Sequence, residues 1–212
     1  MLEEARRLNP LNTDHSANLG RLYRAWGEMT TDPALRSQRL VQASEYYRQA
    51  TTLSPNAAHL QNEWAIVFME ENDLTQAAAR LQRSLELDRE FDQTYLLLGD
   101  LARAKNDWAD AEAQYKKALA LNPQLLQARS ALALVYAQQG KLAEAIAENL
   151  EVLRGAPNDL QTHRNLALLY QQAGQIAEAL AQARIARDLT PENERGPLDQ
   201  LIAELEKQLG GG

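Results

Sequence analysis

The chain has 212 residues, no cysteine, and a formal net charge of −7 from 22 basic and 29 acidic residues. Without cysteine it has no disulfide, no thiolate nucleophile and no cysteine-ligated zinc, and its acidic balance does not suit binding to nucleic-acid phosphates. No apolar run approaches the roughly 20 residues that a membrane-spanning helix needs, so this segment is not expected to insert into a membrane.

The first 55 residues combine a short opening segment with a long unit. Residues 1–10 have the pattern of the closing half of an amphipathic helix and lack the regions of a signal peptide. We interpret them as a half-repeat cut from a longer protein. In residues 11–55, Asp32-Pro33 predicts a helix start with Asp as N-cap. Pro55 follows Pro10 by 45 residues, whereas later intervals are 34, so 11 extra residues should lengthen one or both helices of this unit.

Residues 56–191 repeat with a period of 34, which predicts four further units: 56–89, 90–123, 124–157 and 158–191. Each unit has two helix-length segments of about 14 residues around a short turn. Asn and Gly tolerate the left-handed conformation that ends a helix. These residues open the four turns: Asn72-Asp73, Asn106-Asp107, Gly140-Lys141 and Gly174-Gln175.

One position in the second helix of every unit is alanine, which predicts a buried contact between closely packed helices. The five residues are Ala43, Ala77, Ala111, Ala145 and Ala179. In the first helices, small residues such as Gly20 should let backbones approach, with larger side chains beside them. No useful stretch alternates with period two, so we predict helices and no strands.

The C-terminal residues predict one more helix. Apolar residues with helical spacing follow Pro197, and the opposite side is polar; the apolar set is Leu198, Leu201, Ile202, Leu205 and Leu209. Residues 192–209 should therefore form a capping helix over the last repeat, followed by a tail at 210–212.

No catalytic or metal-binding pattern is present. None of His15, His59 and His163 has a second histidine at the helical i+4 spacing, and phosphate loops and nucleophile elbows are missing. The adjacent Glu70 and Glu71 should point different ways on a helix as solvated surface. We expect a protein that is not an enzyme and uses no cofactor or metal.

The repeated unit resembles the tetratricopeptide repeat. The unit at 90–123 matches best, with Leu98-Gly99, Ala102, Ala111, Tyr115 and Pro123. The resemblance implies an all-α fold, a right-handed superhelical α-solenoid of helix–turn–helix repeats with a C-terminal capping helix. One departure is Asn149, which occupies an aromatic position of the fourth unit.

In proteins with these repeats the first helices line a concave groove that receives a peptide or a helix of a partner. Carried over to this sequence, the groove would have an apolar centre and cationic edges. Its residues would be Asn18, Arg21, Arg24, Asn62, Glu63, Ile66, Leu96, Leu97, Asp100, Arg103, Ala131, Leu134, Arg164, Asn165 and Leu168. Two interpretations stay open, an ordinary helix-packing surface or a peptide groove. Trp26, beside the insertion, is a further candidate anchor.

The resemblance favours a non-enzymatic scaffold that binds a protein or peptide, and two alternatives remain. The stretch from Leu8 to Tyr23 is similar to the repeat region of some bacterial O-antigen ligase/polymerase-like membrane proteins, which would make the chain an appendage of an envelope enzyme. Self-association through the repeat face exposed at the N-terminus is the other. We leave two locations open, the cytoplasm or an extracytoplasmic compartment, for a domain of a longer protein.

Overall fold

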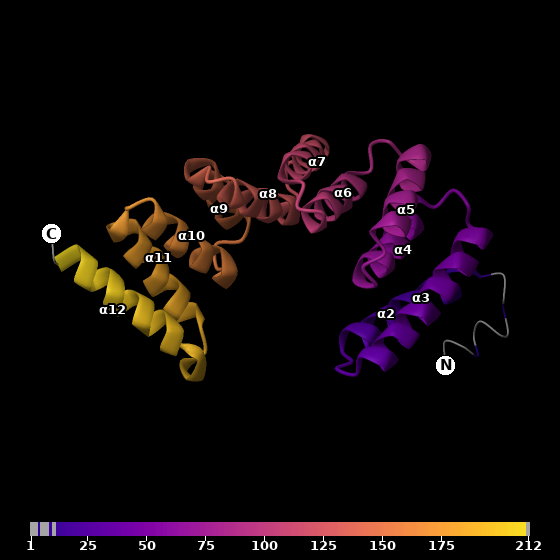
Figure 1. The fold of residues 1–212 in the computed structure, drawn as a ribbon, viewed down its shortest axis with the longest axis horizontal. Helices are drawn as coiled ribbons and strands as arrows, with labels where there is room; N and C mark the ends of the chain where they lie inside the picture. The colour runs from indigo at the N-terminus through magenta and orange to yellow at the C-terminus, as the bar shows by residue number, and fades with distance from the viewer. Residues whose placement is uncertain (1–3, 5–8, 10–11, 211–212) are drawn as a thin grey trace. The chain divides into compact units, whose positions relative to one another are not determined.

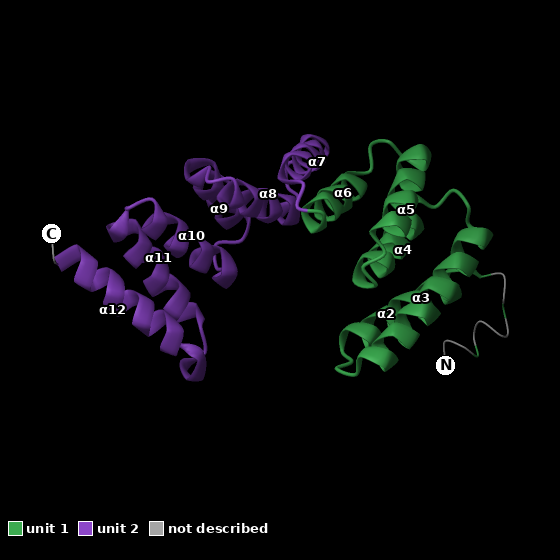
Figure 2. Cartoon of the chain, viewed as in Figure 1, with its two compact units in different colours: residues 1–105 green, residues 106–212 purple. Residues whose placement is uncertain are grey.

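The computed structural model describes residues 4, 9 and 12–210. Within these residues every regular element is helical and no strand occurs, as the repeat pattern predicts (Figure 1). The chain divides into two units, residues 1–105 and residues 106–212 (Figure 2). The predicted half-repeat at 1–10 lies outside the described residues, apart from positions 4 and 9.

Unit 1 is built from helical hairpins. The bounds of its helices are α2 (Thr13–Glu28), α3 (Pro33–Leu53), α4 (Ala58–Glu70), α5 (Leu74–Leu87) and α6 (Asp92–Ala104). Helix α2 packs along α3, and α4 packs along α5 (Figure 1). Helix α6 contacts both α4 and α5, so successive hairpins share one continuous interior.

The eleven extra residues of the first hairpin extend its helices. Helix α2 has 16 residues and α3 has 21, whereas α4 has 13 and α5 has 14. The turn between α2 and α3 is also one residue longer than the turn between α4 and α5. The side chain of Asp32 caps α3 by accepting hydrogen bonds from the backbone N–H groups of Ala34 and Leu35, and Pro33 occupies the first helical position.

Unit 2 continues the same construction. Its helices are α7 (Trp108–Leu121), α8 (Leu126–Gln138), α9 (Leu142–Gly155), α10 (Leu160–Gln172), α11 (Ile176–Leu189), the short 3₁₀ helix η1 (Glu192–Glu194) and α12 (Gly196–Gly210). Helix α8 packs on α7 and α9, α10 packs on α9 and α11, and α12 packs on α11. No helix among the described residues has the length and apolar character that crossing a bilayer requires.

The turn residues have the backbone conformation that the sequence predicts. Asn72 and Asn106 have φ values of 60° and 59°, and Gly140 and Gly174 have φ values of 73° and 74°. These positive values let the chain reverse between the two helices of a repeat, since asparagine and glycine adopt them at low cost.

Small residues set the distance between paired helices. All five in-phase alanines, Ala43 to Ala179, are 0% exposed. In the first hairpin, a methyl group added to Gly20 would lie only 2.9 Å from Cε2 of Tyr47, whose ring is itself buried. The glycine therefore makes room for the tyrosine ring.

Helix α12 covers the end of unit 2 by burying part of its apolar stripe. Leu205 is fully buried in a cluster with Ala167 and Ala179 from α10 and α11, and Leu198 is 5% exposed. Leu209 differs from the prediction, because it is 54% exposed. It lies in the last turn of α12, so the apolar contact of this helix ends one turn before the helix does.

Candidate interaction surface

Two leucines on successive first helices of unit 2 are exposed to solvent. Leu134 on α8 is 44% exposed and Leu168 on α10 is 49% exposed. They lie 34 residues apart, so they occupy the same position in adjacent repeats. Two residues before each, Leu132 and Leu166 are buried in the interior. The helical period thus places Leu134 and Leu168 away from the core.

A cavity of about 250 Å³ adjoins these leucines. Its walls come from α8, α9 and α10, and they combine small apolar residues with amide side chains. The lining residues are Ala133, Leu134, Ala137, Gln138, Asn149, Asn165, Leu168, Leu169 and Gln172. We call this set the leucine face. Three of the predicted groove residues, Leu134, Asn165 and Leu168, belong to it.

Asn149 is the buried polar residue of the leucine face. It is 2% exposed, and its Nδ2 donates a hydrogen bond of 2.8 Å to the backbone oxygen of Ala145. That bond orients the amide, because only the nitrogen can donate to a carbonyl. The side-chain oxygen Oδ1 is buried and has no hydrogen-bond partner. In the sequence, Asn149 is recognisable as a departure from the repeat pattern, but it is not among the predicted groove residues.

The other predicted groove residues of unit 2 lie on the same first helices. Ala131 on α8 is partly exposed. Arg164 on α10 donates a hydrogen bond of 3.3 Å to Oγ1 of Thr190. Asn165 accepts a hydrogen bond of 2.9 Å from Gln161, one helical turn away.

In unit 1 the predicted cationic residues are paired with carboxylates. Arg21 on α2 donates two hydrogen bonds to Glu63 on α4, of 2.9 and 2.6 Å, and a third to Asn18. Arg24 lies 3.6 Å from Glu28 and 3.4 Å from Glu70. The contacts with Glu63 and Glu70 join α2 to α4, so the guanidinium groups of both arginines are engaged within the chain.

The remaining predicted residues of unit 1 are mostly packed. Asn62 is 4% exposed and Leu96 is 8% exposed, so neither offers its side chain to a surface. Leu97 is half-buried and packs against the cluster that contains Leu81, and Ile66 is also half-buried. Asp100 and Arg103 form an ion pair of 3.2 Å along α6.

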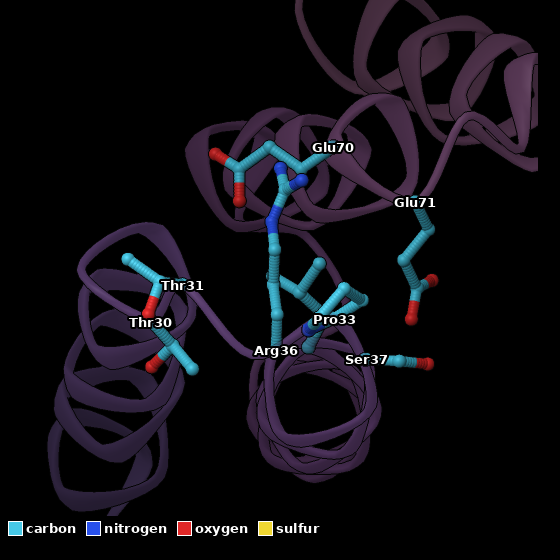
Figure 3. Close-up of a pocket in the computed structure, with 8 residues that line it drawn as sticks. Thr30, Thr31, Pro33, Arg36, Ser37, Glu70 and Glu71 are labelled. Atoms are coloured by element: carbon cyan, nitrogen blue, oxygen red, sulfur yellow. The ribbon is translucent and has the colours of Figure 1, made fainter.

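A second cavity, of about 360 Å³, lies where the lengthened hairpin overhangs the end of α4. Most of its lining residues are polar or charged, and the full set is Thr30, Thr31, Pro33, Arg36, Ser37, Leu40, Glu70 and Glu71. Figure 3 shows Arg36 rising from α3 toward Glu70, while Glu71 points away from that pair. The two carboxylates diverge as predicted, but the prediction of solvated surface is wrong for Glu70, whose side chain is only 17% exposed.

The surroundings of Glu70 favour its neutral form. Burial, and then a hydrogen bond with Glu28, raises the pKa of Glu70 to about 7, and Arg24 opposes this rise only in part. Burial also raises the pKa of Glu71, with the charge of Asp73 adding to it. The sequence could not show this, because the helices that cover Glu70 belong to the hairpin before it.

Trp26 is partly held by its own hairpin. Its side chain is 43% exposed, and its ring meets Tyr23 edge-on at 5.3 Å between centroids. The guanidinium of Arg39 lies 5.8 Å from the centre of the indole and donates a hydrogen bond of 2.8 Å to the backbone oxygen of Trp26. Trp26 thus links α2 to α3.

Comparisons with known proteins find similarity in sequence to one repeat family and similarity in fold to several solved structures. The model of the tetratricopeptide repeat (TPR) matches residues 62–125 and 96–159. Among solved structures, YrrB, described as a TPR protein with an unusual peptide-binding site, is 19% identical with a TM-score of 0.63, and 97% of each chain is covered. The MamA protein is 20% identical with a TM-score of 0.65, covering 84% of this chain and 91% of MamA.

Yeast Tom70 gives a TM-score of 0.79 at 17% identity, covering 98% of this chain and 42% of Tom70. Among curated proteins, none matches this chain. At these identities the structural likeness establishes the fold alone. The sequence family is identified by the match to the repeat model. We conclude that residues 62–159 belong to the tetratricopeptide-repeat family and that the chain has the fold of tetratricopeptide-repeat proteins.

Proposed function

We propose that this chain is a non-enzymatic interaction scaffold that binds a peptide or a helix of a partner protein on its leucine face. The observation that carries the proposal is the exposure of Leu134 and Leu168 beside an apolar cavity. Burying such leucines against a partner is favourable, at about 25 cal/mol for each Å² of apolar surface removed from water.

The surroundings of the two leucines suit a peptide. Gln138, Asn165 and Gln172 line the same cavity, and amide side chains can both donate to and accept from a peptide backbone. An apolar floor with a polar rim is the usual composition of a partner site. The likeness in fold to YrrB, which is described as having a peptide-binding site, supports the same kind of use here.

The leucine face of unit 2 is a better candidate for peptide binding than the first helices of unit 1. Arg21 and Arg24 would have to release Glu63 and Glu70 before they could bind an acidic partner. Leu134 and Leu168 of unit 2 have no ion pair to break before they can contact a partner. We therefore expect that the main contribution to affinity comes from burying Leu134 and Leu168, with little dependence on salt.

The experiment begins with a displayed library of random peptides selected against the 212-residue chain. Affinities of the selected peptides are then measured for Leu134→Glu, Leu168→Glu and a control, Leu150→Glu. Leu150 is 39% exposed on α9, a second helix, so the control has matched exposure on a different helix type. Circular dichroism and melting temperature check that all three variants are folded.

We expect each substitution on the leucine face to weaken the selected peptides at least tenfold, while Leu150→Glu leaves their affinity unchanged. Failure to select any peptide would contradict the proposal. So would peptides that lose affinity with Leu150→Glu and keep it with both variants of the leucine face.

A further inference from the structure

One position of the leucine face differs from the equivalent positions of the earlier repeats. Asn149 in α9 is the equivalent, 34 residues on, of Tyr115 in α7, which is 0% exposed. Leu81 and Tyr47 hold the same position in the preceding repeats, and both are fully buried. In three repeats the chain therefore fills this position with a large side chain of its own. In the fourth it has a smaller amide beside an open cavity.

The buried amide in the cavity lining, Asn149, has an acceptor that the chain does not use. Oδ1 of Asn149 is buried without a partner, whereas Nδ2 of the same amide is engaged by Ala145. A buried oxygen without a donor costs on the order of 1–3 kcal/mol, so native structures usually provide a partner from protein, water or ligand. A ligand with a donor at its tip would complete this site.

The other residues that line the cavity restrict which kind of hydrogen-bond donor can bind beside Asn149. Ala133, Ala137, Leu134, Leu168 and Leu169 form an apolar surround, and the cavity lining has no charged residue. A cationic donor such as lysine would lose its hydration without a compensating carboxylate. An apolar side chain with a neutral donor avoids that cost. Tyrosine has this construction, and it is the residue that the chain itself places at the matching position of the third repeat.

We propose that the cavity beside Asn149 binds a tyrosine side chain of the partner peptide, with the phenol O–H donating to Oδ1 of Asn149. The inference rests on the proposed function, since it names the residue that the leucine face recognises. Leu134 and Leu168 would contact the ring, while Asn149 selects for the hydroxyl.

The test uses small probes and the intact chain. The probes are p-cresol, which represents the tyrosine side chain, toluene and 4-methylanisole, which have the ring without a donor, and 3-methylindole, which represents tryptophan. Binding is followed by the NMR signals of the Asn149 side-chain amide and of the neighbouring leucine methyl groups. Two variants accompany the native chain: Asn149→Leu, which copies Leu81 and removes the acceptor, and Asn149→Tyr, which copies Tyr115 and fills the cavity.

For the native chain we expect p-cresol to bind about tenfold more tightly than toluene or 4-methylanisole, as one buried neutral hydrogen bond provides. Asn149→Leu should abolish this preference but still bind toluene, and Asn149→Tyr should bind none of the probes. Equal binding of p-cresol and toluene would overturn the inference, as would stronger binding of 3-methylindole or no binding of p-cresol. The native-chain comparison gives a result even if a variant does not fold.

The two proposals fail in different ways. If p-cresol binds as expected but the library yields no peptide, only the proposed function is contradicted. If selected peptides depend on Leu134 and Leu168 but lack tyrosine and are unaffected by Asn149→Leu, the tyrosine site is contradicted and the scaffold function stands.

Discussion

Asn62 on α4 donates a hydrogen bond to Thr94 on α6, with 3.0 Å between Nδ2 and Oγ1, and both side chains are buried. Ser84 on α5 lies 2.9 Å from the same hydroxyl and also donates to the backbone oxygen of Ala58. Three helices of unit 1 thus share one buried polar network. Asn62, which the repeat register assigns to a groove, holds adjacent hairpins together.

Removing the central hydroxyl of this network should destabilise the protein. Thr94→Val keeps the shape of the side chain but leaves polar groups of Asn62 and Ser84 without their partner. We expect a loss of about 1–3 kcal/mol in the free energy of unfolding, measured by urea denaturation. Thr52→Val is the control, because Thr52 is exposed and bonds only to its own helix. Equal effects of the two substitutions would show that the network contributes nothing.

The close contact between Gly20 and Tyr47 predicts whether replacing Gly20 by alanine stabilises or destabilises the protein. In an unconstrained helix, glycine to alanine stabilises by about 0.5–1 kcal/mol. Here the new methyl group would lie 2.9 Å from the Tyr47 ring, so Gly20→Ala should instead destabilise by about 1–3 kcal/mol. Gly196→Ala, where nothing lies within 4 Å of the added carbon, is the comparison. A stabilised Gly20→Ala variant would contradict the close packing of α2 on α3.

Glu70 should make unfolding stability depend on pH. Its pKa is about 7 in the folded chain and about 4.3 when unfolded, so the folded state binds the proton more tightly. The contribution of Glu70 to the free energy of unfolding should therefore be highest below pH 4, fall as pH rises from about 4 to 7, and change little further above that. Arg24, Glu28 and Arg36 are the charged groups that face Glu70.

Glu70→Gln keeps the side chain neutral at every pH, so it should remove the loss of stability that accompanies ionisation of Glu70. Relative to the native chain, the variant should gain on the order of 1–2 kcal/mol between pH 4 and pH 8, measured by denaturation at each pH. Glu90→Gln, at an exposed position, is the control for removing one negative charge. A constant difference between Glu70→Gln and the native chain across this range would refute the assignment.

The fold could be predicted from the sequence because its determinants are local and repeated. The buried alanines, the left-handed turn residues and the cap at Asp32 each follow from a few neighbouring residues. The longer first hairpin follows from simple counting, since its added residues extend α2 and α3.

The candidate site was less predictable, because the exposure of a side chain depends on what the neighbouring repeat provides. The repeat register assigns both Leu97 and Leu134 to the groove. Leu97 on α6 nevertheless packs against α4 and α5 of the preceding hairpin, whereas Leu134 is 44% exposed. Glu70 is covered by a hairpin whose overhang is specific to this chain. Asn149 was visible as a departure from the pattern, but only the structure shows the unpaired oxygen and the cavity beside it.

The most direct test of the central claim is methyl NMR of the leucine-labelled chain during titration with a library-selected peptide. We expect the largest changes in chemical shift on the methyl groups of Leu134 and Leu168, while the methyl signals of Leu150 stay unchanged. Changes concentrated on Leu150, with Leu134 and Leu168 unmoved, would contradict peptide binding at the leucine face.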